Sequence, residues 1–277
     1  MTVQPQVSLV TPTLNAASTL PRTLQSALNL RLQGIDIDHW VIDGGSNDTT
    51  IDYVKSFCKK NDWCKLIQKP GLQIYQSMNL GLAQAEGHFC HVLNADDFIL
   101  KPGTYANLLR HGIENNAAML IMGVVVFKLN NGQIIRRWQV DDPSSKGTTW
   151  RNACKKGLHV AHPGFVALTS LYKRTGFSLD YPDSADYMLM QSLLLDPELQ
   201  EMVESTRELV IGMASGGKTS RPSSILRGIK QLKAINKELG IKQTLLKRYF
   251  EKSIEILRCQ MWGDFLEFPD NLPGLQK

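Results

Sequence analysis

Apolar residues in the first hundred positions alternate between short β-rich runs and stripes at helical spacing. The runs predict strands at residues 7–11, 39–42, 66–67 and 89–93. The stripes predict helices after Ser18 or Thr19, after Asn47 and Asp48, and over residues 74–85. Repeated strand–helix alternation predicts an α/β fold with a mostly parallel sheet and helices on both faces.

The pattern changes in the second half of the chain. A strand is predicted at 120–129, followed by a hairpin turn at Gly132 and a strand at 134–138. After Trp150 the periodicity loosens, and from Ser223 it becomes helical. Two apolar stripes carry this signal: Leu226, Ile229, Leu232 and Ile235, then Leu246, Phe250, Leu257 and Met261. We therefore expect one α/β domain over 1–220 and a helical C-terminal extension over 221–277.

Composition narrows the class of protein. Of the 277 residues, 43% are hydrophobic, which is ordinary for a globular protein with a sizeable core. No apolar run approaches the roughly 18 residues of a membrane span. The N-terminus has neither the charged nor the apolar region of a signal peptide, so a cytoplasmic location is expected. The five cysteines show no disulfide or metal-ligand spacing and are expected to be reduced thiols.

The net charge of +5 is concentrated near the C-terminus. Between Lys218 and Arg258 there are eleven basic and three acidic residues, a net of +8, which leaves −3 for the rest of the chain. Three interpretations stay open for this basic segment: a solvated helical face, attachment to an anionic membrane surface, or nucleic-acid binding. Nucleic acid is the least favoured partner, because no reading motif accompanies the charge.

Polar clusters follow two of the predicted strands. Asp43 to Ser46 places a carboxylate and two glycines after one strand, and Asn94 to Asp97 places an amide and two carboxylates after another. Ligands bind at the carboxyl ends of strands in open α/β sheets. Such carboxylate and amide oxygens suit Mg²⁺ or Mn²⁺. Each cluster taken alone also fits a turn that caps the following helix.

The order of these motifs resembles that of the GT-A nucleotide-sugar glycosyltransferases of family 2, especially members in bacterial polysaccharide assembly. The residues that carry the resemblance are 7–15, 41–50, 69–81 and 93–97. The resemblance implies a Rossmann-like GT-A fold and transfer, with inversion, of a sugar from a UDP-, GDP- or TDP-type donor. The acceptor would be a glycan or lipid-linked glycan of a surface polysaccharide.

The resemblance also implies roles for particular residues. Asp96 would be the metal ligand, although Asn94 stands where many relatives carry an acid, which lowers the charge of the site. Asp97 would contact the metal or the donor sugar. The residues implied in donor nucleotide binding are Thr11, Pro12, Asn15, Asp43, Gly44, Gly71, Asn79, Asn94, Ala95 and Asp96.

A catalytic base is also required. Asp186 resembles the late acidic motif of the family and would deprotonate the acceptor hydroxyl. A first-turn acid favoured by the helix dipole is the alternative interpretation. His162 borders the acceptor site by resemblance, or is a structural polar residue. Lys218, in the Gly-Gly-Lys segment, would close over the donor diphosphate or belong to a plain hinge.

Two other functions remain open. A nucleotidyltransferase would share the nucleotide-binding sheet and the acidic metal site, but it would usually carry a glycine-rich signature after the first strand, which this chain lacks. A non-catalytic carbohydrate-binding relative is the other alternative, and Asn94 is its only hint. A homo-oligomer is compatible with the sequence.

Overall fold

A computed structural model describes residues 4–215 and 222–242, together with 253, 256, 258, 259 and 264–266. Within them, nine strands form one sheet in the order β3-β2-β1-β4-β8-β6-β9-β5, with β7 paired to β6. The strands are β1 (Val7–Thr13), β2 (Ile37–Asp43), β3 (Cys64–Gln68), β4 (Phe89–Val92), β5 (Phe98–Ile99), β6 (Met119–Lys128), β7 (Ile134–Trp138), β8 (Phe165–Leu168) and β9 (Val203–Ser215).

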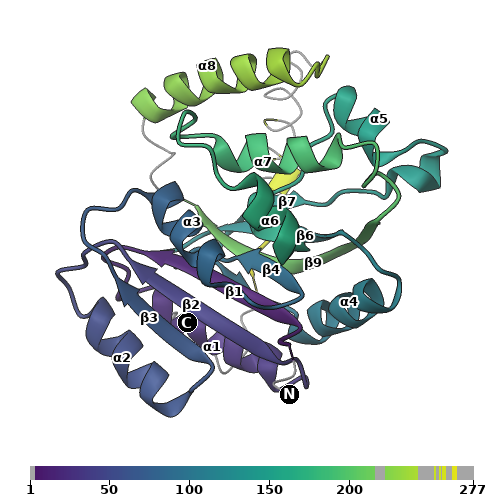
Figure 1. Cartoon of the computed structure of the whole chain (residues 1–277). Helices are drawn as coiled ribbons and strands as arrows, with labels where there is room; N and C mark the ends of the chain where they lie inside the picture. The colour runs from purple at the N-terminus through teal and green to yellow at the C-terminus, as the bar shows by residue number, and fades with distance from the viewer. Residues whose placement is uncertain are drawn as a thin grey trace.

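Helices cover both faces of this sheet (Figure 1). They are α1 (Leu20–Arg31), α2 (Thr50–Lys60), α3 (Ile74–Gln84), α4 (Pro102–Glu114), α5 (Trp150–Lys155), α6 (Thr169–Thr175), α7 (Ala185–Leu194) and α8 (Pro222–Glu238), with short 3₁₀ turns η1 (Pro143–Lys146) and η2 (His162–Gly164).

The part of the sheet built from the first 92 residues is parallel, as predicted. Strand β1 pairs in parallel with β2 and with β4, and β2 pairs in parallel with β3. Beyond β4 the sheet is mixed, because β8 runs antiparallel to both β4 and β6. Strand β9 runs parallel to β6 and antiparallel to β5. The α/β fold expected from the sequence is therefore confirmed, with a parallel first half and a mixed second half.

Two apolar cores lie on opposite faces of the sheet because strand side chains alternate between faces. Leu9 packs with residues of α1, α2 and α4 on one face. Val10, the next residue of β1, packs with residues of α3, α5, α6 and α7 on the other. Both cores meet the sheet at β1, which fixes this strand at the centre of the fold.

Strand β1 runs two residues further than predicted, through Pro12 to Thr13. Proline donates no backbone hydrogen bond and is normally excluded from central strands. The β4 ladder ends at the Val10–Val92 pair, so Pro12 lies beyond it with only β2 beside it. The strand therefore tolerates the proline and carries Thr13 to the edge of the sheet.

Strand β9 and helix α8 complete the fold. The first half of β9 is partly exposed and contains acidic and basic residues, which hides its strand periodicity in the sequence. Helix α8 was predicted, and it packs on α7 through Leu232 and Ile235 against Tyr187. Among the helices that the structure describes, none is both long and apolar enough to cross a membrane.

Candidate active site

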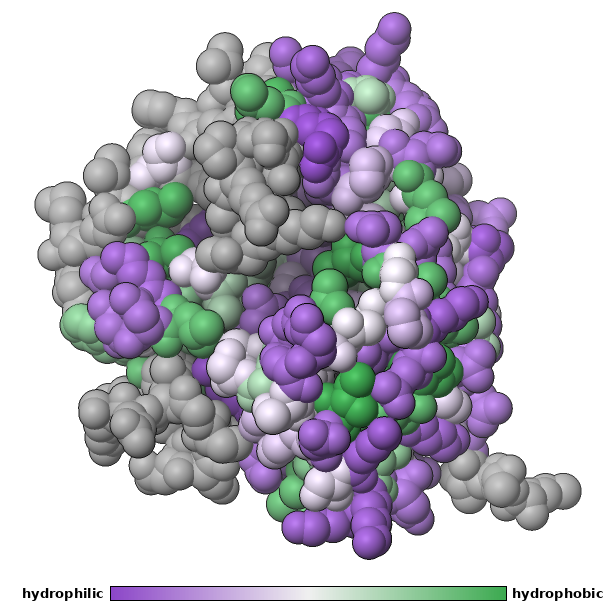
Figure 2. Space-filling view, turned by 90° about the vertical axis from the view of Figure 1, so that its left-hand side faces the viewer, coloured by the Kyte–Doolittle hydropathy of each residue, from purple (hydrophilic) through white to green (hydrophobic). Residues whose placement is uncertain are grey.

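The loops that follow β1, β2 and β3 lie on one side of the molecule, at the left of Figure 1. Figure 2 views the molecule from that side and shows a mostly hydrophilic surface that is hollowed near its middle. The carboxyl ends of parallel strands form the usual ligand site of an open α/β sheet. The predicted site residues are therefore expected at this edge of the sheet.

Hydrogen bonds tie the loop after β1 to the loop after β2. The Asn15 side chain accepts a bond from the Asn47 amide (2.9 Å), and the Ser46 hydroxyl accepts one from the Asn15 amide (2.8 Å). Asn15 adopts a left-handed conformation with φ of 51°, which asparagine tolerates better than most residues. Asn15 is exposed at the carboxyl end of β1, and its role in donor binding stays a prediction.

The Asp43 carboxylate is buried inside its own loop. Its Oδ1 accepts bonds from the amides of Gly45 and Ser46 (both 2.9 Å), and its Oδ2 accepts one from the Ser46 hydroxyl. A carboxylate has about four acceptor positions, so three of them are occupied within the protein. Asp43 thus shapes the loop, and these bonds leave one acceptor position of the carboxylate unused.

The predicted glycines bring two loops into close approach. The Gly71 amide donates to the Gly44 carbonyl (2.9 Å). A Cβ atom at Gly44 would lie 3.2 Å from the Leu72 carbonyl oxygen. Gly71 has φ of 87°, a conformation that side-chain-bearing residues rarely adopt. These glycines therefore join the loops after β2 and β3 into one backbone surface.

Two predicted residues have side chains that are occupied elsewhere. The Thr11 hydroxyl is fully buried and lies 2.9 Å from His39 Nε2, so the structure does not bring it to the ligand edge. Thr13, at the end of β1, has a buried hydroxyl without a hydrogen-bond partner. The Asn79 amide exchanges two hydrogen bonds with the backbone of Phe177 (both 2.8 Å) and so joins α3 to the segment after α6.

The acidic turn, residues 94–97, lies between β4 and β5. Asn94 Nδ2 donates to Asp97 Oδ2 (2.9 Å), and Asp97 is fully buried. Burial and the neighbouring Asp96 raise the pKa of Asp97 well above its usual range. Burial also raises the pKa of Asp96, although its side chain is partly exposed. The turn therefore presents Asp96 outward and keeps Asp97 inside.

The donor atoms of this turn fit a hard divalent cation. Asp96 offers a partly exposed carboxylate, and the Asn94 Oδ1 atom is a buried acceptor without a partner. Oxygen ligands of this kind suit Mg²⁺ or Mn²⁺ when phosphate oxygens supply the remaining positions. Within the described residues, no group of three or more His, Cys, Asp or Glu side chains forms a metal cluster. The turn can therefore contribute only part of a coordination shell.

Asp186 lies in the first turn of α7, where the Tyr75 hydroxyl of α3 donates to its Oδ1 (2.9 Å). A cavity of about 120 Å³ is lined by Asp186 together with His162. His162 Nε2 is buried without a partner, and burial lowers the pKa of this histidine against the opposing effect of Asp186. A carboxylate and a neutral imidazole therefore share one small cavity.

Strand β9 connects this cavity to the acidic turn. Met213 lines the cavity that contains Asp186. The next residue, Ala214, donates a backbone hydrogen bond to Asp97. His91 of β4 adds a second link, because its Nε2 lies 2.9 Å from the carbonyl oxygen of Pro163, the residue after His162. The fold thus brings together two motifs that are about ninety positions apart in the sequence.

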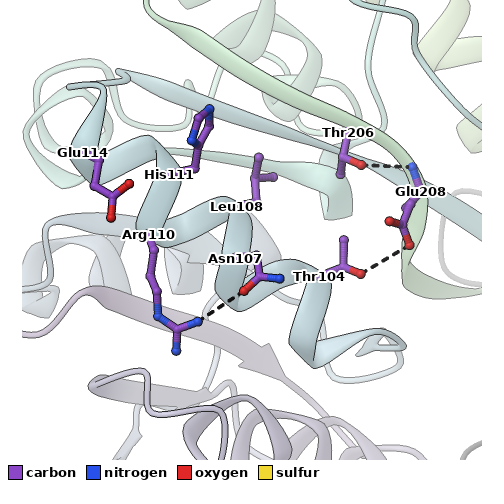
Figure 3. Close-up of a pocket in the computed structure, with 8 residues that line it drawn as sticks. All are labelled: Thr104, Asn107, Leu108, Arg110, His111, Glu114, Thr206 and Glu208. Atoms are coloured by element: carbon purple, nitrogen blue, oxygen red, sulfur yellow. Dashed lines mark hydrogen bonds between the residues drawn. The ribbon is translucent and has the colours of Figure 1, made fainter.

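A larger hollow, of about 500 Å³, lies away from these residues. Figure 3 shows that α4 and β9 line it, with Thr104 bonded to Glu208 across the gap. Its lining mixes cationic, anionic and neutral side chains, including Arg110 and Glu114. It does not contain any predicted site residue, so the loop edge remains the candidate active site.

The structure adds two candidate residues that the sequence analysis did not name as site residues. Leu14 is 57% exposed and lies beside Gly44. Ile74 is 39% exposed and is the first residue of α3. Both lie at the loop edge. Leu14 and Ile74 stand out because they are apolar residues exposed next to polar loops, and this exposure is visible only in the three-dimensional structure. Lys218, with its Gly-Gly-Lys segment, lies outside the described residues, as does the second apolar stripe (Leu246, Phe250, Leu257 and Met261).

The family profile described as glycosyl transferase family 2 matches residues 8–176. This range contains the loops after β1 and β2 and the acidic turn, and it covers more than half of the chain. The chain belongs to glycosyl transferase family 2. The resemblance that the motifs carried is therefore confirmed.

Similarity to curated relatives is partial. The chain is 31% identical over 128 residues to a PGL/p-HBAD biosynthesis glycosyltransferase of Mycobacterium bovis. The match covers 46% of this chain and 49% of the relative, so the chain spans about half the length of the curated relatives it matches.

Solved structures of this fold cover most of the chain. Staphylococcus aureus TarS 1–349 in complex with UDP-GlcNAc is similar with a TM-score of 0.61 and 18% identity, over 92% of this chain and 72% of that one. The mannosyltransferase PcManGT of Pyrobaculum calidifontis, in complex with GDP-Man and Mn²⁺, has a TM-score of 0.55 and 15% identity, over 95% and 72% of the two chains. At these identities the likeness shows the GT-A fold.

Proposed function

We propose that this protein is an inverting glycosyltransferase that moves a sugar from a nucleotide-diphosphate sugar to the hydroxyl of a glycan or lipid-linked acceptor in surface polysaccharide synthesis. The observation that carries the proposal is the link through β9, where Met213 lines the Asp186 cavity and Ala214 bonds Asp97. A general base and a diphosphate site must be neighbours for such a transfer. Family membership supports the proposal.

Asp186 is the proposed general base. Tyr75 occupies its Oδ1, which leaves Oδ2 to accept the proton of an acceptor hydroxyl that enters the cavity. His162, held neutral by burial, would contact the same acceptor through its unpartnered Nε2. Proton removal raises the nucleophilicity of the hydroxyl as the sugar leaves its diphosphate.

The diphosphate end of the donor would lie against the acidic turn. Asp96 and the Asn94 Oδ1 atom would hold Mg²⁺ or Mn²⁺, and the bound ion would supply charge neutralisation for the leaving diphosphate. Structural neighbours that were solved in complex with Mn²⁺ support this choice. Asp97, which is buried, would act by bracing the turn through Asn94.

The nucleoside would bind at the loop edge. Exposed Leu14 and Ile74 offer apolar surface for the face of a base, and the remaining acceptor position of Asp43 suits a base N–H. Pro12 and Thr13 are the last two residues of β1, and the Thr13 hydroxyl is buried without a hydrogen-bond partner. The main chain of the acidic turn at Ala95 would face the ribose and diphosphate.

We treat residues 221–277 as a basic extension of the transferase domain, which spans residues 1–220. We propose that this extension associates peripherally with a membrane, and helix α8 supports the proposal. Its buried side packs on α7, while Lys230, Lys233 and Lys237 are exposed. Spacings of three and four residues place these lysines on one helix face, and Leu226 extends that face with 66% of its surface exposed. Such a face suits an anionic lipid surface.

A donor screen tests the proposed function. UDP-, GDP- and TDP-sugars are added with and without Mn²⁺, and thermal shift and nucleotide-diphosphate release are measured together. A donor at 100 times its dissociation constant should stabilise the fold by about 2.7 kcal/mol. Release of a nucleoside diphosphate supports a glycosyltransferase, whereas release of sugar 1-phosphate, with transfer of the nucleoside monophosphate, would indicate a nucleotidyltransferase. Binding without turnover, with any acceptor glycan, would leave only the carbohydrate-binding alternative.

A further inference from the structure

Arg22 is a fully buried cation on the third position of helix α1, with only 1% of its surface exposed. Its guanidinium lies 5.0 Å from the ring centre of Phe98 and 5.4 Å from that of Phe127. Phe98 follows the acidic turn directly. Arg22 therefore sits beneath the turn that the proposed function assigns to the donor diphosphate.

The position is costly for an arginine. The Nε and Nη1 atoms are buried without hydrogen-bond partners. A cation near the N-terminus of a helix also opposes the helix dipole. Burial lowers the pKa of Arg22, and the charges of Asp96 and Asp97 act against this shift. A buried charge is tolerated only with such compensation, so the acidic turn and Arg22 depend on each other.

Backbone contacts make the dependence specific. Arg22 Nη2 donates to the Asp96 carbonyl (3.3 Å), and the Thr23 hydroxyl donates to the Asp97 carbonyl (2.6 Å). One turn later, the Ser26 hydroxyl accepts a bond from the Ile99 amide (3.0 Å). One face of α1 thus holds the backbone from Asp96 to Ile99.

We infer that Arg22 is a positioning residue for donor binding: it fixes the backbone at Asp96 and supplies a buried positive charge behind the site for an anionic diphosphate–metal complex. The inference rests on the proposed function. A nucleoside diphosphate with Mn²⁺ keeps a net negative charge, so the Arg22 charge attracts the complex as a whole. The hydrogen bond to the Asp96 carbonyl holds the residue that would bind the metal.

The test is direct binding, measured without turnover. UDP, GDP and TDP are each titrated calorimetrically, with Mn²⁺ present, into the wild-type protein, Arg22→Met, Arg22→Lys and Leu30→Ala. Leu30 is fully buried on the same helix, more than two turns from Arg22, so its truncation lowers stability at a distance from Arg22. We expect Arg22→Met to weaken nucleotide binding about tenfold or more, since it removes one nearby charge.

Arg22→Lys keeps the positive charge but replaces the planar guanidinium with an ammonium group, so we expect nucleotide binding about threefold weaker than in the wild type. Leu30→Ala should bind as the wild type does. The inference is overturned if Arg22→Met binds as tightly as Leu30→Ala, or if Arg22→Lys matches the wild type. If the Met variant does not fold, the Lys variant decides alone. Absence of binding by the wild-type protein would instead refute the proposed function.

Discussion

The Tyr75 hydroxyl donates a 2.9 Å hydrogen bond to Asp186 Oδ1, and this bond joins helix α3 to helix α7. Tyr75 is buried and stacks on Phe177, with ring centres 5.5 Å apart. Burial and the Asp186 charge raise the pKa of Tyr75 well above its usual range, so the hydroxyl stays a donor. The orientation of Asp186 is thereby set by a residue 111 positions away.

Replacing Asp186 by Asn should remove the proposed base and leave donor binding intact. Turnover should fall by roughly 10²–10⁴-fold. Asp183→Asn is the matched control, because Asp183 pairs with Arg227 of α8 rather than lining the cavity. Steady-state rates and calorimetric donor affinity are measured for both variants. Full turnover by Asp186→Asn would exclude this residue as the base.

Tyr75→Phe should lower the turnover number while leaving the Michaelis constant of the donor unchanged. A hydrogen bond to a charged group contributes about 1.5–3 kcal/mol, so a roughly ten- to hundredfold loss is expected. Tyr181→Phe is the control, since it removes a Tyr–carboxylate bond to Glu238 on the surface. An equal effect of both variants would mean that Tyr75 acts only through stability.

Asn94→Asp should strengthen metal binding and weaken the fold in the absence of metal. The substitution replaces the donor to Asp97 with a third carboxylate in the turn, and like charges repel at this distance. We expect a lower melting temperature without metal and a larger upward shift on addition of Mn²⁺ than in the wild type. Thermal denaturation across a Mn²⁺ titration measures both. A shift no larger than that of the wild type would contradict a metal site at this turn.

Stability should decline as pH falls below the usual pKa of histidine. Burial lowers the pKa of His39 to about 3 and that of His91 to about 4. The folded state then binds fewer protons than the unfolded chain, so this stability is present above about pH 6.5 and is lost toward the folded pKa values. Each histidine contributes about 1.4 kcal/mol per pH unit in that window.

His39→Gln isolates one of these contributions. The variant removes the titrating group and keeps a polar atom near the Thr11 hydroxyl. Denaturant unfolding at several pH values between about 4.5 and 6.5 should show a slope about 1.4 kcal/mol per unit shallower than that of the wild type. Equal slopes in the two proteins would refute the contribution of His39.

Charge reversal of Lys230, Lys233 and Lys237 should abolish binding to anionic vesicles. Sedimentation with phosphatidylserine-containing vesicles is compared with sedimentation with neutral vesicles, at low and high salt, because salt screens such attraction. The triple variant Lys55→Glu, Lys59→Glu and Lys60→Glu on α2 changes the net charge equally on another exposed face. If both triple variants bind alike, the α8 face has no specific role.

The sequence predicted the first half of the fold because its signals are local. Strands β1 to β4 each combine a short apolar run with a following polar turn, and α1 to α3 carry apolar stripes. Strands β8 and β9 escaped prediction because β8 has four residues and β9 begins with partly exposed charged positions. Their strand conformation depends on partners from β4 and β6, which a local pattern does not contain.

The sequence by itself determined the motif order that identified the family, and it supplied Asp43, Asp96 and Asp186 as candidate site residues. Tertiary structure decided what surrounds each candidate group. It buried Thr11 against His39 and left the Thr13 hydroxyl at the strand end. It also placed Arg22 under the acidic turn and Tyr75 against Asp186. These pairings join residues far apart in the chain, and their burial and charge exist only once the sheet and helices have packed.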